Sequence, residues 1–321
     1  MTRLRYDSAK DLDQAIALVA RSGSRIIAGG TDLLGAMESG LDLATAVVDI
    51  SRAASMHAIA VAADGGLRIG AGARLEDIAG HPDVRSRFPV LAEAAASVGT
   101  PALRAMGTLG GNLCQRPRCW YLRSRIPCLK NGGSGCPAEH GENQYHAVFG
   151  EGPCHAAHPS DAAVALQALE AVIIVRGPSG TRSLSVEQLY ANAASDPLTE
   201  TTLAAGEIIE AVELPATSAG GRQLFTKLMQ RGAWDFATAS LAGVRRVDGT
   251  VRLVFGGVGP APVRVNPSVE EDVASGELDQ DSVDALAERE MYDAKPLELN
   301  GYKVQQAAAL LKRAMLELSR A

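Results

Sequence analysis

Residues 26–34 read Ile-Ile-Ala-Gly-Gly-Thr-Asp-Leu-Leu. The apolar start predicts a buried strand and the residues after Asp32 predict a helix, so two glycines stand between a strand and a helix. Upstream, residues 3–6 predict a strand that is followed by a helix with Ser8 as its N-cap, and residues 46–50 predict another buried strand. The N-terminal segment is therefore expected to contain a β-α-β unit with a glycine turn at the end of its second strand.

The glycine turn has the character of an anion-binding site. Glycines allow positive φ angles and leave backbone N–H groups bare, and such groups at a helix N-terminus suit a phosphate or pyrophosphate. In this turn Thr31 adds a hydroxyl and Asp32 is a candidate N-cap. No Lys follows as in a Walker loop, and no GxGxxG occurs. A second turn, Gly107-Thr108-Leu109-Gly110-Gly111-Asn112, follows about eighty residues later, and two such turns could hold the two ends of one long phosphate-bearing ligand.

The remaining chain predicts an α+β protein in three parts. We expect a first subdomain at residues 1–57, a second at 58–214 and a C-terminal α+β domain at 215–321. Residues 114–158 are rich in Cys, Pro, Gly and His and show no sustained periodicity. An irregular stretch of this length inside a compact domain is unusual unless something other than a hydrophobic core organises it.

Composition excludes several classes of protein. The 31 basic and 37 acidic residues give a net charge of −6, with no block of Lys or Arg, so binding to nucleic acid is not expected. No apolar run reaches the length of a membrane span, and the N-terminus shows no apolar core of a signal peptide. The expected location is the cytoplasm; export together with a signal-bearing partner would instead place the protein in the periplasm.

Five cysteines occur in the chain, all between residues 114 and 154. An odd number of clustered thiols is typical of metal binding and not of a disulfide framework. Four thiolates hold either a tetrahedral zinc ion or an iron–sulfur cluster. The absence of CxxC pairs and the glycine-rich connection favour a cube-shaped cluster, although spacing alone does not exclude zinc. The four candidate ligands, separated by eight, seven and seventeen residues, are Cys119, Cys128, Cys136 and Cys154.

Other residues have both a structural and a functional interpretation. Cys114 is expected in the core as a small apolar side chain. Asp161 is either an N-cap or a carboxylate that binds a ribose or ribityl hydroxyl. Lys227 is either part of a solvated strand edge or a cation beside an electron-rich cofactor, whereas Arg231 is expected at the surface. The histidines of residues 140–158 are interpreted as hydrogen-bonding groups.

Taken in order, both glycine turns, Ser160-Asp161 and Lys227 with Arg231 resemble the FAD-binding subunit of the xanthine dehydrogenase family of molybdenum hydroxylases. The resemblance covers nearly the whole chain. It implies a two-subdomain FAD-binding domain of the vanillyl-alcohol-oxidase/PCMH type, followed by a C-terminal α+β domain. The insertion of some 40 residues with four cysteines resembles the medium subunits of aldehyde oxidoreductase and of 4-hydroxybenzoyl-CoA reductase, which implies an additional [4Fe–4S] cluster.

The resemblance also implies roles for individual residues. The first turn would wrap the FAD pyrophosphate, the second would bind FAD from the other subdomain, Asp161 would bind on the ribose or ribityl side, and Lys227 would lie near the flavin ring. An aromatic residue that stacks on the flavin in some members has no counterpart at Ser97-Val98-Gly99. The implied FAD contacts are Ile27, Ala28, Gly29, Gly30, Thr31, Asp32, Leu33, Leu34, Thr108, Gly111, Asn112, Gln115, Asp161 and Lys227.

The function implied by this resemblance is electron transfer. A large subunit with molybdopterin would oxidise an aldehyde, a small subunit with two [2Fe–2S] clusters would pass the electrons on, and FAD in this chain would deliver them to an external acceptor. The alternative enzyme is an aromatic acyl-CoA reductase of the 4-hydroxybenzoyl-CoA type, with the opposite electron flow. An alternative of another class is a zinc-stapled interaction protein without a redox role.

Overall fold

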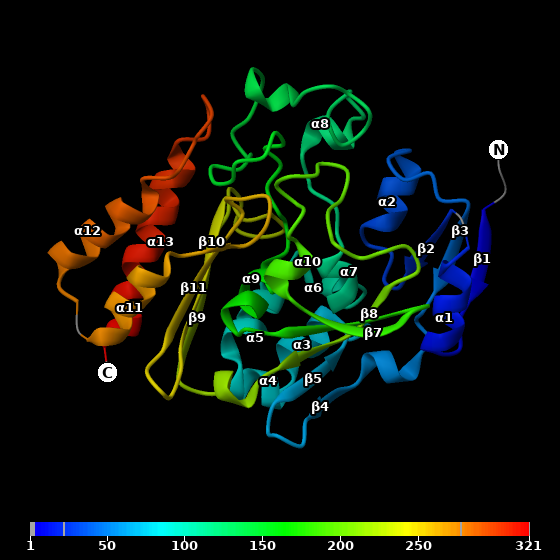
Figure 1. The fold of residues 1–321 in the computed structure, drawn as a ribbon, viewed down its shortest axis with the longest axis horizontal. Coiled ribbons are helices and arrows are strands. Elements are labelled where there is room, and N and C mark those ends of the chain that lie inside the picture. Colours follow the sequence, from blue (N-terminus) through cyan, green and yellow to red (C-terminus); the bar gives the residue numbers. More distant parts are fainter. Residues whose placement is uncertain (1–3, 22, 277, 321) are drawn as a thin grey trace.

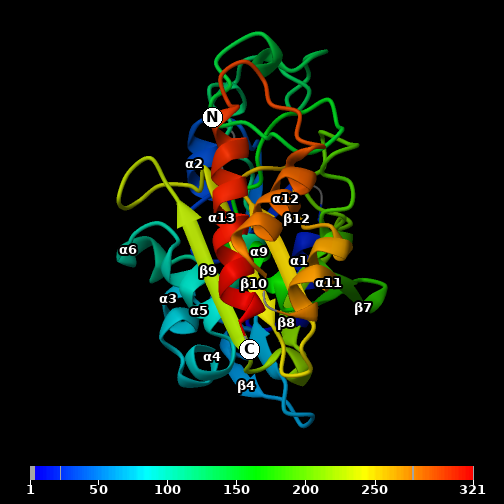
Figure 2. The same ribbon diagram turned by 90° about the vertical axis from the view of Figure 1, so that its left-hand side faces the viewer.

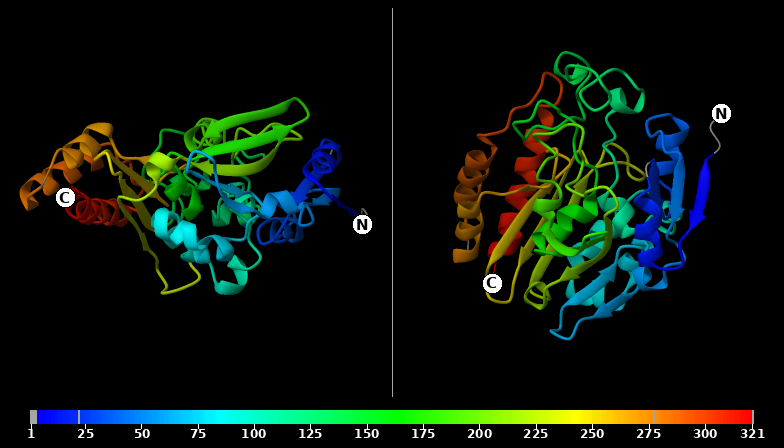
Figure 3. Two further views of the ribbon diagram at one scale, coloured as in Figure 1. Left: turned by 90° about the horizontal axis from the view of Figure 1, so that it is seen from below. Right: turned by 45° about the vertical axis from the view of Figure 1, so that its right-hand side comes forward.

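The computed structural model describes residues 4–21, 23–276 and 278–320. Its strands form three separate sheets that lie side by side, and the two termini lie at opposite ends of the molecule (Figures 1 and 3). The mixture of helices and sheets confirms the predicted α+β class, whereas the domain boundaries at 57/58 and 214/215 stay predictions. In the described ranges, no helix combines the length and the apolar character that crossing a membrane requires.

The first sheet is parallel and contains, in spatial order, β1 (Arg5–Ser8), β3 (Ala46–Asp49) and β2 (Ser24–Ile27). Helix α1 (Leu12–Val19) connects β1 to β2, and α2 (Leu33–Glu38) connects β2 to β3. The expectation that Ser8 caps α1 is wrong. Ser8 is the last residue of β1, and the Asp11 carboxylate instead accepts a hydrogen bond from the Gln14 N–H. The helix starts one residue after Asp11, which makes Asp11 its N-cap.

The second sheet is antiparallel, with the order β4-β5-β8-β6-β7. Its central strand β8 was not expected from the sequence. Residues Leu67 and Leu214 are paired in the sheet although they lie far apart in the chain, and local periodicity carries no information about such a pairing. The strands are β4 (Ile59–Val61), β5 (Leu67–Gly70), β6 (Val172–Gly177), β7 (Gly180–Ser185) and β8 (Ile208–Leu214).

A layer of helices separates the second sheet from the third. Helix α9 (Asp161–Ala168), which the sequence predicted, is buried along its whole length and packs against the third sheet, as does α5 (Pro89–Ala96). Since α9 begins where the irregular segment ends, its N-terminus is fixed deep inside the molecule. The other helices of this part are α3 (Leu75–Gly80), α4 (Pro82–Arg87), α6 (Pro101–Arg104), α7 (Leu109–Leu113) and α10 (Val186–Leu189).

The third sheet is antiparallel, with the order β12-β11-β10-β9. Helix α13 (Tyr302–Ser319) lies along its outer face (Figure 2). A Cβ atom at Gly243 in β10 would lie 2.8 Å from the Leu318 side chain, so glycine there permits the close approach of α13. The remaining elements are β9 (Arg222–Leu228), β10 (Ala239–Arg245), β11 (Val251–Gly256), β12 (Val263–Arg264), α11 (Pro267–Ser275) and α12 (Gln280–Met291).

Residues 114–158, here called the cysteine segment, are largely irregular, as expected. They contain one helical turn, α8 (Trp120–Arg123), and a 3₁₀ turn at Pro137–Glu139. The fully buried Lys303 at the start of α13 fastens this segment to the C-terminal domain. Its Nζ donates to the carbonyl oxygens of Tyr145, His146 and Gly257 at 3.1, 2.9 and 2.6 Å. Lys303 therefore helps to fix the segment through polar contacts with its backbone.

Candidate functional site

The two glycine segments meet in space. A Cβ atom at Gly29 would lie 1.8 Å from the Met106 carbonyl oxygen, directly before Gly107, and Gly30 has φ +69°. Both positions therefore require glycine. The second segment is not a plain turn as expected, because its latter half forms α7. The Thr108 hydroxyl caps this helix by accepting a hydrogen bond from the Gly111 N–H at 3.2 Å.

The glycine segments line a cavity that continues into two neighbouring ones. The first, of about 480 Å³, is lined by both segments. The second, of about 100 Å³, shares Thr31, Asp32, Thr108 and Gly111 with the first. Every residue predicted to contact FAD lines one of these two cavities except Leu34, which is exposed. The structure thus brings together predicted residues from both FAD-binding subdomains and from β9.

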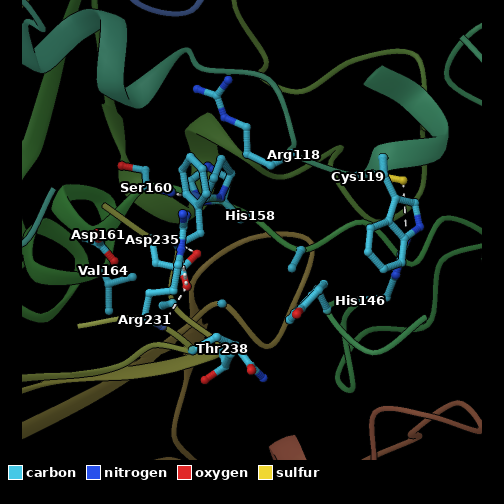
Figure 4. Close-up of a pocket in the computed structure, with 18 residues that line it drawn as sticks. Arg118, Cys119, His146, His158, Ser160, Asp161, Val164, Arg231, Asp235 and Thr238 are labelled. Carbon is cyan, nitrogen blue, oxygen red and sulfur yellow. Dashed lines mark hydrogen bonds and ion pairs between the residues drawn. The ribbon is translucent and has the colours of Figure 1, made fainter. Parts of the chain in front are cut away.

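A third cavity, of about 390 Å³, extends from the second one to the cysteine segment. It shares Arg118, Asp161 and Phe236 with the second cavity. Figure 4 shows Cys119 and His146 on one side of this third cavity and Asp161 on the other. The cavities share lining residues, so the glycine segments and the first of the four candidate metal ligands lie on neighbouring cavities.

Asp161 and Lys227 form a buried ion pair where the second subdomain meets the C-terminal domain. The Lys227 Nζ lies 2.7 Å from the Asp161 Oδ2, with side-chain exposures of only 4% and 6%, and donates to the Ser97 carbonyl oxygen at 3.1 Å. Burial raises the pKa of the Asp161 carboxyl, and the Lys227 ammonium opposes that rise. Asp161 is not the N-cap of α9, because the Ser160 hydroxyl accepts from the Ala163 N–H. The carboxylate and its ammonium partner face the second cavity instead.

The carboxylate of Asp32 is bound by the cysteine segment and does not cap α2. Its Oδ1 accepts from Arg118 Nη1 at 2.6 Å and from Arg123 Nη2 at 2.9 Å, and its Oδ2 accepts from the Arg116 N–H at 2.9 Å. Burial alone would raise the pKa of Asp32, but these groups hold it below its ordinary value. The sequence analysis missed all three arginines, although three cations around Cys119 are a readable signal for a nearby anion.

Two aromatic side chains that the sequence analysis also missed line the second cavity. Trp234 and Phe236 belong to the connection between β9 and β10, and Trp234 has a positive φ of 53°. Val98 and Gly99 line the same cavity, so its wall carries no aromatic residue at the position where one was sought. The Arg118 guanidinium lies 5.1 Å from the centre of the Phe236 ring. The aromatic residues in this wall come from the connection between β9 and β10, which local sequence patterns do not indicate.

All four candidate metal ligands lie within the cysteine segment, and Cys128 is the most buried of them. The pKa of the Cys119 thiol is raised to about 11, mainly by burial and to a smaller extent by the nearby thiols of Cys154 and Cys136. Cys154 in turn is affected by Cys136 and Cys128. Within the described ranges, no three His, Cys, Asp or Glu side chains are arranged closely enough to hold one metal ion. The thiols of Cys119 and Cys154 are therefore each near enough to Cys136 for its charge to affect them.

Cys114 does not lie in the core, contrary to expectation. Its side chain is exposed along the wall of the first cavity, although the surrounding protein is dense enough to raise the pKa of its thiol to about 12. The structure thus separates Cys114 from the other four cysteines. Of the histidines, His146 has its Nε2 at 3.3 Å from the Cys119 Sγ. His158 is buried and packs edge-on against Tyr190 at 4.3 Å, and burial lowers its pKa to about 3.

Comparisons with known proteins agree with this architecture. A family model described as the FAD binding domain in molybdopterin dehydrogenase matches residues 2–217. The chain is 36% identical over 299 residues to the aldehyde oxidoreductase FAD-binding subunit of Escherichia coli, covering 92% of this chain and 91% of that protein. It is 26% identical over 324 residues to the carbon monoxide dehydrogenase medium chain of Hydrogenophaga pseudoflava, covering 98% and 96%.

A solved structure of carbon monoxide dehydrogenase from Hydrogenophaga pseudoflava has the same fold. Its TM-score is 0.76 at 24% identity, covering 98% of this chain and 97% of that chain. The predicted PCMH-type FAD-binding fold is thereby confirmed. The family model covers about two thirds of the chain, and a relative is 36% identical over nearly all of it. The chain therefore belongs to the FAD-binding medium subunits of the xanthine dehydrogenase family of molybdenum hydroxylases, which are subunits of oxidoreductases.

Proposed function

We propose that this chain is the electron-transfer subunit of a molybdenum-containing aldehyde dehydrogenase or oxidase, with FAD in its cavities and a [4Fe–4S] cluster on Cys119, Cys128, Cys136 and Cys154. The relative that is named as an aldehyde oxidoreductase subunit supports the aldehyde assignment. One observation carries the electron-transfer assignment. Cys119 lines a cavity that adjoins the one lined by both glycine segments and by Lys227, so the two redox groups would lie close together.

The glycine segments fit a dinucleotide. Any side chain at Gly29 would collide with the Met106 carbonyl, and the bare backbone opens onto a cavity large enough for the adenosine and pyrophosphate of FAD. Thr108 and Asn112 follow from the opposite subdomain. Beyond them, Lys227 would place a positive charge at the ring, where negative charge accumulates on reduction. Trp234 and Phe236 would cover the ring from the C-terminal domain.

The four thiols fit a polynuclear cluster better than zinc. A single tetrahedral ion draws its four ligands into direct contact with one point, whereas a cube of iron and sulfide separates them. In support of this, the Cys136 thiol raises the pKa of both Cys119 and Cys154. Gly132, with φ +94°, and Gly133, where a Cβ would lie 2.6 Å from the Cys128 nitrogen, permit a tight turn beside Cys128.

The partners follow from this assignment. A large subunit with molybdopterin would oxidise the aldehyde, and a small subunit with [2Fe–2S] clusters would carry single electrons to this chain. Bound FAD would supply the conversion between single-electron transfer and two-electron delivery to an external acceptor. This chain's residues would bind and orient the flavin, exclude water from the ring and fix charges around it.

The test is an anaerobic analysis of iron, sulfide, zinc and flavin in the purified protein. We expect about four irons and one FAD per chain, with loss of iron in Cys128→Ser. The matched control is Cys114→Ser, which changes a thiol outside the four-cysteine set and should keep the iron. Flavin without iron would refute the cluster, and zinc without flavin would favour the interaction protein. An acyl-CoA reductase would instead require reduction of an aromatic acyl-CoA by the assembled enzyme.

A further inference from the structure

The contacts around Asp32 connect the two cofactor sites. We propose that Asp32 and Arg118 are positioning residues that couple occupation of the cysteine site to the binding of FAD. The inference rests on the proposed function, because it requires both cofactors in one chain. It adds that neither cofactor binds independently of the other.

Asp32 lies at the proposed FAD site. It follows Thr31 in the first glycine segment, lines both the first and the second cavity, and its side chain is only 18% exposed. Its partners Arg116, Arg118 and Arg123 all lie in the cysteine segment, more than 80 residues further along the chain. A buried carboxylate that loses such partners pays a desolvation penalty, so the conformation of the glycine segment depends on them.

Arg118 lies in the cysteine segment and directly precedes Cys119, the first candidate cluster ligand. One of its Nη atoms donates to Asp32, the other donates to Gln115 Oε1 at 3.1 Å, and its guanidinium lies over the Phe236 ring. A single side chain therefore contacts three walls of the second cavity. Because Arg118 is adjacent to Cys119 in the chain, the positions of this guanidinium and of the first candidate ligand are linked through one peptide unit.

A second carboxylate repeats the connection. Glu200 lines the first cavity and lies 3.1 Å from Arg116 Nε and 3.6 Å from Lys130 Nζ. Lys130 stands two residues after Cys128 and also donates to the Pro197 carbonyl oxygen at 2.8 Å. Residues of the cysteine segment on both sides of α8 therefore contact Glu200 in the wall of the first cavity.

Occupation of the cysteine site controls how well these contacts are made. The segment has little regular structure, so without its metal group it gains conformational freedom and loses the fixed position of Arg118. Part of the binding free energy of FAD would then be used to order the glycine segment, so FAD would bind more weakly. Because coupling between two binding free energies is reciprocal, bound FAD must also raise the equilibrium affinity of the chain for its cluster by the same factor.

The experiment measures the dissociation constant of FAD for the full chain, purified with its associated subunits, before and after removal of the cluster by an iron chelator and an oxidant. Cys128→Ser provides a second cluster-free form. We expect cluster removal to weaken FAD binding by about tenfold or more in the wild type. In Asp32→Asn, Arg118→Gln and Glu200→Gln the factor should be smaller. Taking the ratio within each variant cancels any direct loss of contact with FAD.

Matched controls are Asp272→Asn and Arg289→Gln, an ion pair at 3.1 Å on α11 and α12, which should keep the wild-type ratio. The reciprocal readout is the chelator concentration at which half of the iron is lost at equilibrium, which FAD should raise in the wild type more than in Arg118→Gln. If the wild-type protein contains iron but its FAD affinity does not change on cluster removal, the coupling is refuted and the cluster assignment stands. A wild-type protein without iron would overturn the cluster assignment and the coupling together.

Discussion

Replacing Lys227 by Met tests the buried ion pair at the flavin site. The substitution removes the ammonium that lies 2.7 Å from the Asp161 carboxylate and leaves that carboxylate buried beside Ser97. Removing one partner of a buried pair typically costs about 3–5 kcal/mol. Because both side chains are almost fully buried, we expect a loss in this range in the free energy of unfolding at neutral pH, measured by urea denaturation of the FAD-free protein.

The loss should depend on pH. Without Lys227, nothing compensates the burial that raises the pKa of Asp161, so the carboxyl takes up a proton in the folded state at a higher pH than in the unfolded state. The folded variant then binds more protons, and its stability falls as the pH rises. The deficit relative to the wild type should therefore narrow between about pH 8 and about pH 5.5.

Two variants complete this experiment. Asp161→Asn in the Lys227→Met background removes the buried carboxylate charge that has lost its partner, and it should recover about half of the lost free energy of unfolding. Arg289→Met breaks the exposed ion pair with Asp272, in which both side chains are about half exposed, and should cost no more than about 0.5 kcal/mol. A deficit below about 1 kcal/mol for Lys227→Met, or one that does not change with pH, would refute the interpretation of this pair.

Three further predictions concern single side chains. Burial lowers the pKa of Lys303 to about 7, below its value in the unfolded chain. The unfolded state therefore binds more protons, and stability rises with pH. The free energy of unfolding should increase by about 2 kcal/mol from pH 7 to pH 9, and this increase should be absent in Lys303→Met. Burial lowers the pKa of His158 to about 3. Acid should therefore destabilise the fold below about pH 6.5, by about 2 kcal/mol at pH 5. In acid unfolding titrations, His158→Phe should abolish this loss of stability. Gly29→Ala would place a Cβ 1.8 Å from the Met106 carbonyl oxygen and should lower the flavin content, whereas Gly35→Ala, which meets nothing within 4 Å in α2, should not; equal flavin contents in the two variants would contradict the close approach of the glycine segments.

Several features of the fold and site could be predicted from the sequence because their signals are local. The apolar strand, the glycines and the helix of residues 26–34 follow one another in the chain, and so do the helix at 161–169 and the four cysteines within an irregular segment. The motifs that carried the resemblance to the FAD-binding family are also short and ordered along the chain.

Only the tertiary structure decided how these local features contact one another. Asp32 has the sequence position of an N-cap, yet it binds arginines more than 80 residues away because the cysteine segment folds over the glycine segment. Asp161 and Lys227 become an ion pair because α9 packs against the third sheet. Cys114 faces a cavity instead of the core. Local propensity depends on a few neighbouring residues, whereas burial and charge pairing depend on chain segments that only the packed fold brings together.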